Sequence, residues 1–143
     1  MKTLNLLIIA LVTLFVSCGK DDNNLLEVDL ESIQGRWELR DRFGGQAVVS
    51  SPDYEIPDSQ VIEFDGQRFR RISDGVTYAE GTYEIVEVEV REIDGNEFSR
   101  KIIFNDETEN GTSDQFVRLS GNRLILSMGS IASDGVTDTY EKI

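Results

Sequence analysis

The feature that most constrains the fold is a regular alternation of short β-rich runs and tight-turn dipeptides that begins near residue 35. Eight β-rich runs lie at about 35–43, 60–64, 67–73, 76–91, 97–105, 114–119, 123–128 and 136–142. The intervening dipeptides pair glycine with aspartate or asparagine, which tolerate the positive φ values of tight hairpins. They are Asp65-Gly66, Asp74-Gly75, Asp94-Gly95, Gly121-Asn122 and Asp134-Gly135. Short strands at this spacing predict a β-sandwich or a closed barrel.

Several of these runs alternate apolar and polar residues with a period of two. Val86, Val88 and Val90, for example, share one face and have charged neighbours on the other. This alternation is typical of half-buried antiparallel strands. Because hairpin-length turns connect most runs, we predict an all-β chain that forms a small antiparallel up-and-down β-barrel of about eight strands. At Gly81, inside the longest run, we expect a bend or bulge rather than a break.

One connection is longer than the others. Residues 44–59 follow the first run and contain both prolines of the chain, Pro52 and Pro57. In a barrel, a connection at this place is positioned to cover part of the mouth. We therefore expect it to act as a partial lid.

Composition excludes several classes of function. The chain of 143 residues has no histidine and one cysteine, and its net charge is −13. Histidine-based catalysis is excluded, and a single cysteine supplies neither an internal disulfide nor a thiolate zinc site. Phosphate groups repel so acidic a chain, so we expect no nucleic-acid partner.

The N-terminus has the form of an export signal. Lys2 precedes an uncharged, mostly apolar run at residues 4–16, which is shorter than the roughly 20 residues a spanning helix needs. The run ends at Phe15–Gly19, which resembles the lipobox of bacterial lipoproteins. That resemblance implies a signal peptide at 1–17, cleavage before Cys18, and acylation of Cys18 as a lipid anchor. The alternative is an ordinary secretory signal with a chance cysteine.

The polar stretch after the cysteine reads as a flexible tether at residues 18–26. Within it, Lys20-Asp21-Asp22 resembles the surface-export signal of Bacteroidetes lipoproteins. We therefore expect an outer-membrane protein anchored on the cell surface, with anchorage facing the periplasm as the alternative.

The first run resembles the first strand of lipocalins, in which Gly-x-Trp appears here as Gly35 and Trp37. In that family the tryptophan closes the base of the barrel beneath a basic residue, for which Arg118 and Arg123 are both candidates. Further features resemble the lipocalin-like domains of Bacteroidetes lipoproteins. They are Phe64-Asp65-Gly66, Gly81-Thr82-Tyr83, Leu124-Ile125-Leu126 and Thr139-Tyr140-Glu141-Lys142. The resemblance implies a lipocalin-like domain at residues 27–143.

Candidate ligand-binding residues are Arg68, Arg70, Tyr83 and Phe104. Arg68 and Arg70 share one strand face, and Phe69 and Arg71 share the other. An arginine inside a barrel pairs both oxygens of a carboxylate ligand. The competing interpretation, which we favour, places the arginine pair on a solvated face beside glutamates.

The acidic loop at 105–111 matches the opening spacing of a calcium loop, but Val117 stands where the closing glutamate belongs. We therefore interpret it as a hairpin tip, and we expect no metal and no cofactor. No nucleophile or phosphate-loop motif is present, so we do not expect an enzyme.

The leading hypothesis is an anchored, monomeric binding module that holds a small apolar or amphipathic molecule in the barrel. The alternative is a structural or interaction module for protein or glycan, with a filled barrel and no small-molecule ligand.

Overall fold

The computed structural model describes residues 32–44, 59–130 and 133–143. The strands are β1 (Gly35–Gly44), β2 (Gln60–Asp65), β3 (Arg68–Ser73), β4 (Val76–Ile93), β5 (Asn96–Asp106), β6 (Gly111–Ser120), β7 (Arg123–Ser127) and β8 (Val136–Lys142). Each of the eight predicted runs overlaps one strand. Within these ranges no helix is long and apolar enough to cross a membrane.

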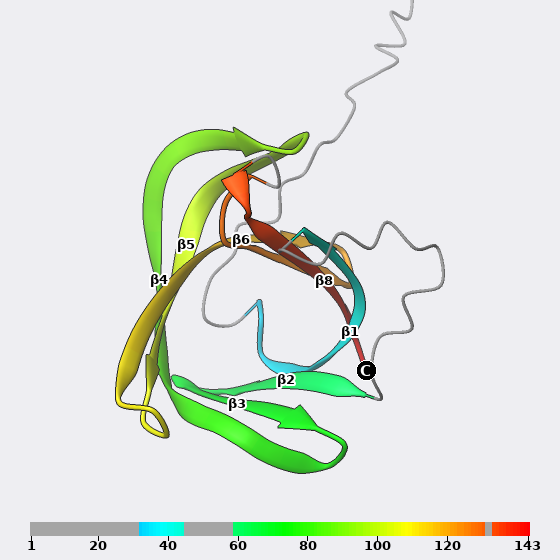
Figure 1. Cartoon of the computed structure of the whole chain (residues 1–143), viewed down its shortest axis with the longest axis vertical. Coiled ribbons are helices and arrows are strands. Elements are labelled where there is room, and N and C mark those ends of the chain that lie inside the picture. The colour runs from blue at the N-terminus through cyan, green and yellow to red at the C-terminus, as the bar shows by residue number, and fades with distance from the viewer. Residues whose placement is uncertain (1–31, 45–58, 131–132) are drawn as a thin grey trace, which may run out of the picture.

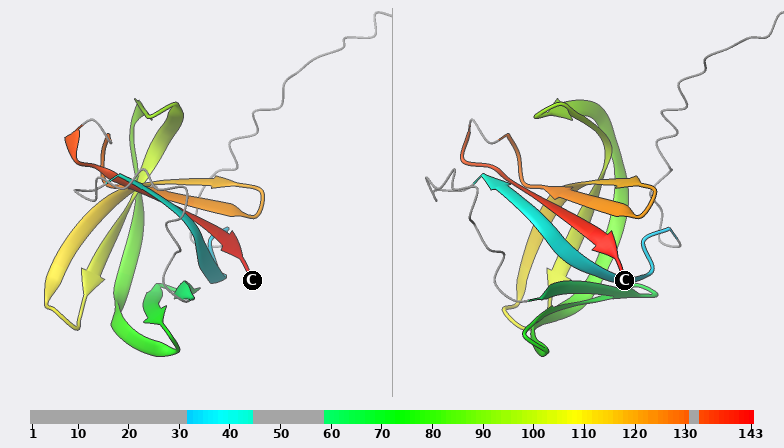
Figure 2. Two further views of the ribbon diagram at one scale, coloured as in Figure 1. Left: turned by 45° about the vertical axis from the view of Figure 1, so that its right-hand side comes forward. Right: turned by 90° about the vertical axis from the view of Figure 1, so that its right-hand side faces the viewer.

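The eight strands close into one antiparallel up-and-down barrel (Figures 1 and 2). Every strand pairs with its neighbours in sequence, and β1 pairs with β8 to complete the ring. The predicted fold class is therefore confirmed, and the sandwich is excluded. The predicted signal peptide, Cys18, the tether and the interior of the 44–59 connection lie outside the described residues.

The hairpin turns have the geometry that their sequences favour. Asp74 and Gly75 have φ values of 50° and 77°, and Asp94 and Gly95 have 49° and 80°. Positive φ at both central residues characterises the type I′ turn, whose twist matches that of the flanking strands. The Asp-Gly dipeptides therefore set the register of the β3–β4 and β4–β5 hairpins.

As expected, β4 runs through Gly81 without a break, and Gly81 does not mark a bulge. It pairs with Phe69 on β3 and Asp106 on β5 without a shift in register. A Cβ atom at Gly81 would lie 2.0 Å from the backbone oxygen of Asn105. Glycine is thus required because another backbone approaches closely, a contact that the sequence pattern does not reveal.

One cluster of buried apolar side chains lies in the barrel interior. Its members are Ile33, Trp37, Leu39, Ile62, Phe64, Phe69, Ala79, Tyr83, Ile102, Phe104, Val117, Leu119, Leu124, Leu126 and Tyr140. Alternate residues of all eight strands contribute, as the period-two pattern predicts. The closed sheet and this cluster lie entirely within residues 33–142.

The distal part of the β4–β5 hairpin, residues 91–98, folds over the outer face of β6. The β4–β5 register is irregular between Glu87 and Arg91, and the hairpin curves away from the rest of the sheet (Figures 1 and 2). The buried ring of Phe98 then lies 5.8 Å from that of Phe116, with the Arg91 guanidinium 5.6 Å from the Phe116 ring. This small cluster is separate from the barrel interior.

Candidate functional site

One end of the barrel, here called the Trp37 end, is closed by Gly35, Trp37, Tyr83 and Lys142. Trp37 is 1% exposed, and its Nε1 donates a hydrogen bond to the Ile33 carbonyl over 2.8 Å. The Lys142 ammonium lies 5.3 Å from the centre of the Trp37 ring. Gly35 leaves room for the lysine stem, because a Cβ there would lie 3.3 Å from Lys142 Cε.

The prediction that Arg118 or Arg123 covers Trp37 is wrong. Arg118 lies on the outer face of β6, where its Nη1 donates to Asn96 Oδ1 over 3.3 Å and its buried Nε has no partner. Arg123 is exposed at the start of β7. Lys142 takes the position because β8 pairs directly with β1, which places Lys142 opposite Trp37.

Tyr83 also belongs to the Trp37 end. Its hydroxyl donates to the Gly66 carbonyl over 2.8 Å and accepts from Gln34 Nε2 over 2.8 Å. Burial raises the pKa of Tyr83, and the hydrogen bond from Gln34 partly opposes that rise. The side chain therefore ties the β2–β3 turn to β4 and to the residue before β1. Because the Tyr83 hydroxyl already makes two hydrogen bonds within the protein, we assign the side chain a structural role.

Phe104 lies inside the barrel, in an aromatic floor formed with Phe64 and Phe69. The Phe69 and Phe104 ring centres are 4.8 Å apart, and those of Phe64 and Phe104 are 6.4 Å apart. Tyr83 meets Phe64 edge-on at 4.9 Å. Rings at these separations are in contact, so the interior at this level is packed with side chains.

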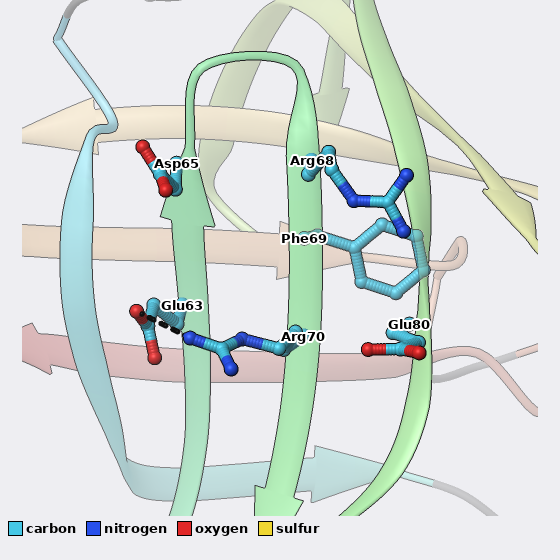
Figure 3. A pocket seen from close by; sticks show the side chains of 6 residues that line it. All are labelled: Glu63, Asp65, Arg68, Phe69, Arg70 and Glu80. Carbon is cyan, nitrogen blue, oxygen red and sulfur yellow. Dashed lines mark hydrogen bonds and ion pairs between the residues drawn. The ribbon is translucent and has the colours of Figure 1, made fainter.

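Arg68 and Arg70 project from the outer face of β3 and do not enter the barrel. Their side chains are 55% and 51% exposed, and they pair with Glu107 and Glu63 over 3.1 and 3.0 Å. The hydrogen bonds that Arg68 donates to Glu107, together with the negative charge of that carboxylate, raise the pKa of Arg68. A surface hollow of about 320 Å³ lies beside them (Figure 3). Its lining residues are Glu63, Asp65, Arg68, Phe69, Arg70 and Glu80.

The arginine that faces inward on β3 is Arg71. It pairs with Ile62 and Ala79, two residues of the core, and shares its face with Phe69. Its guanidinium lies 4.6 Å from the centre of the Phe104 ring and 5.7 Å from that of Phe69. The sequence signal is ambiguous, because each face of β3 carries one apolar residue, Phe69 beside Arg71 and Ile72 beside the other two arginines.

Arg71 belongs to what we call the arginine group: Arg42, Arg71, Asp138 and Tyr140. Arg42 donates two hydrogen bonds to Asp138, from Nε to Oδ1 over 2.6 Å and from Nη2 to Oδ2 over 2.8 Å. The Tyr140 hydroxyl donates to Asp138 Oδ2 over 3.4 Å. A bulge between Leu39 and Asp41 shifts the alternation of β1, which turns Arg42 to the inner face.

The surroundings of Tyr140 show how close these charges are. Burial raises the pKa of Tyr140, the nearby Asp138 carboxylate raises it further, and the cations of Arg71 and Arg42 oppose the rise. The phenol, 8% exposed, therefore stays protonated and serves as a hydrogen-bond donor at neutral pH. Counted over the described residues alone, the group holds two cations and one anion inside a strongly acidic chain.

The acidic loop is the tip of the β5–β6 hairpin. Asp106 Oδ1 accepts hydrogen bonds from the backbone N–H of Thr108 and Glu109 over 2.7 and 3.2 Å. Among the residues the structure describes, no three carboxylate, histidine or cysteine side chains gather to hold a metal ion.

Comparisons of the chain with family models, with curated proteins and with solved structures found no match. The closed barrel of eight antiparallel strands is consistent with a lipocalin-like fold.

Proposed function

We propose that this protein is an anchored outer-membrane lipoprotein whose barrel binds a small amphipathic molecule. The observation that carries the proposal is the arginine group above the aromatic floor. An apolar surface beside a few convergent polar groups is the usual composition of a small-molecule site. Here Phe69 and Phe104 supply the apolar surface, and Arg71 and Arg42 supply the polar groups.

The binding proposal is tested by retention of a native ligand. The mature chain, residues 18–143 with Cys18→Ser, is mixed with a lipid extract of the cells that produce it and repurified. Mass spectrometry of the protein fraction then identifies retained small molecules. We expect one class of amphipathic molecule in near-stoichiometric amount. A protein that emerges free of small molecules contradicts the proposal.

The anchor and the location of the protein are separate parts of the proposal. They rest on the lipobox-like sequence at Cys18 and on the acidic stretch Lys20-Asp21-Asp22. Several acyl chains hold a protein at a membrane far more firmly than one. Metabolic labelling with a palmitate analogue should mark the wild-type chain and not Cys18→Ser. Protease treatment of intact cells should remove a surface protein and spare one facing the periplasm.

A second candidate function, an interaction module for a protein or glycan, is favoured by the packed aromatic floor and the charged hollow outside β2–β4. Here the outer face would be the working surface. Crosslinking on intact cells separates the two functions. A single partner lost in Glu63→Gln plus Glu80→Gln, with no retained small molecule, would establish the second one.

A further inference from the structure

Resting on the proposed function, the arginine group identifies the chemistry of the ligand's polar end. We propose that the ligand is a small amphipathic carboxylic acid whose carboxylate pairs with the guanidinium of Arg71.

The two inward arginines differ in their hydrogen-bond partners. The guanidinium of Arg42 already holds both oxygens of Asp138. Within the described ranges no hydrogen bond or ion pair of Arg71 is present, and its guanidinium lies over the Phe69 and Phe104 rings. Withdrawing a guanidinium from water is unfavourable unless an acceptor compensates it. Arg71 is only half-buried, so water serves its N–H groups in the free protein, and a ligand carboxylate would replace that water.

The charge around Arg71 selects an anion over a neutral or cationic head group. Among the residues that the structure describes, Arg42 and Arg71 face one carboxylate of the group, Asp138. A planar guanidinium fork matches the two oxygens of a carboxylate, and a partly buried site strengthens that pairing. Arg71 is half-buried and so remains accessible to a molecule entering from solvent.

The aromatic rings below Arg71 limit the size of the ligand's apolar part. Phe104 lies directly beneath the guanidinium, and Phe64 and Phe69 pack against Phe104. A long acyl chain would have to displace these rings, so we expect the apolar part to be a short chain or a single ring. The fitting ligand is therefore a compact acid.

Calorimetric titration of the mature Cys18→Ser chain with octanoate and with octan-1-ol tests the proposal at neutral pH. The two probes share an apolar chain and differ in charge. We expect octanoate to bind on the order of tenfold more tightly, as one charge-assisted, two-pronged hydrogen bond implies. Arg71→Gln should abolish the difference, and Arg71→Lys should restore only part of it. Arg70→Gln, on the outer face of the same strand, is the matched control and should keep it.

A second measurement needs no substitution. In the NMR spectrum of the wild-type chain, the Nε–H signal of Arg71 should shift with octanoate and not with octan-1-ol. An Arg71→Gln variant that fails to fold therefore leaves the proposal open to refutation by this signal.

The outcomes separate the two proposals. Equal affinity for octanoate and octan-1-ol overturns the acid specificity and leaves the binding function intact. Tighter octanoate binding that Arg71→Gln does not weaken overturns the role of Arg71. Binding of neither probe, together with no retained lipid in the extract experiment, overturns both proposals.

Discussion

The Trp37 end and the arginine group occupy the same barrel but are built for different purposes. At the Trp37 end, the indole N–H, the Tyr83 hydroxyl and the Gln34 amide all have partners within 2.8 Å. In the arginine group, one guanidinium is fully engaged and the other rests on aromatic rings alone. The first region stabilises the barrel, and the second retains unused hydrogen-bonding capacity, which is common where a protein binds a ligand.

The largest expected difference between the regions is in stability. Trp37→Ala should lower the free energy of unfolding by about 3–5 kcal/mol, because it empties a fully buried site. Arg71→Leu should change it by no more than about 1 kcal/mol, because replacing an unpaired inward cation by an apolar residue removes a desolvation cost. Urea unfolding of the two variants measures both values. A cost for Arg71→Leu as large as that for Trp37→Ala would show that both regions are structural.

A smaller difference in unfolding free energy is expected between variants of the two buried tyrosines, Tyr83 and Tyr140. Tyr83→Phe should cost about 1–2 kcal/mol, because it removes two short hydrogen bonds at the Trp37 end. Tyr140→Phe should cost about 0.5 kcal/mol, because its bond to Asp138 is 3.4 Å long and Asp138 keeps Arg42. Thermal unfolding of both variants at one pH tests this order. The reverse order would contradict the assignment of roles.

The barrel could be predicted from the sequence because strands and tight turns are determined by residues close together in the chain. Alternating residues and Asp-Gly turns report which residues form strands and where the strands reverse, as at Asp74-Gly75. The closure of β1 on β8 is not local, and for that reason Lys142 was not recognised as the residue over Trp37. Arg42 was missed because a bulge reverses the alternation of β1 at Leu39 and Asp41. A bulge has no dependable sequence signal.

The arginines of β3 show a second limit of prediction from the sequence. Alternation separated Arg68 and Arg70 from Phe69 and Arg71, but it does not say which face is inside. The buried Phe69 decides that question. The interpretation of Arg68 and Arg70 as a solvated pair beside glutamates is confirmed by their ion pairs.

The stability of the wild-type chain at alkaline pH should depend on the ionisation of Tyr140. Burial raises the pKa of Tyr140 above its ordinary value of 10.0, so the unfolded chain loses this proton before the folded chain does. The stabilisation is complete below about pH 10 and declines as pH rises above it. Tyr140→Phe should therefore show a shallower loss of stability between neutral pH and pH 11 than the wild-type chain. Identical slopes would mean that Tyr140 ionises in the folded state as it does in water.

A further small effect is expected for the cation over Trp37. Lys142→Gln should cost about 0.5–1 kcal/mol, because Lys142 is exposed and contributes a cation–π contact of ordinary strength. Lys142→Arg should keep most of this energy, since a guanidinium also stacks on an indole ring. Arg123→Gln is the matched control and should leave stability unchanged. Urea titrations of the three variants decide the matter: a cost for Arg123→Gln equal to that for Lys142→Gln would assign the effect to general surface charge rather than to closure of the Trp37 end.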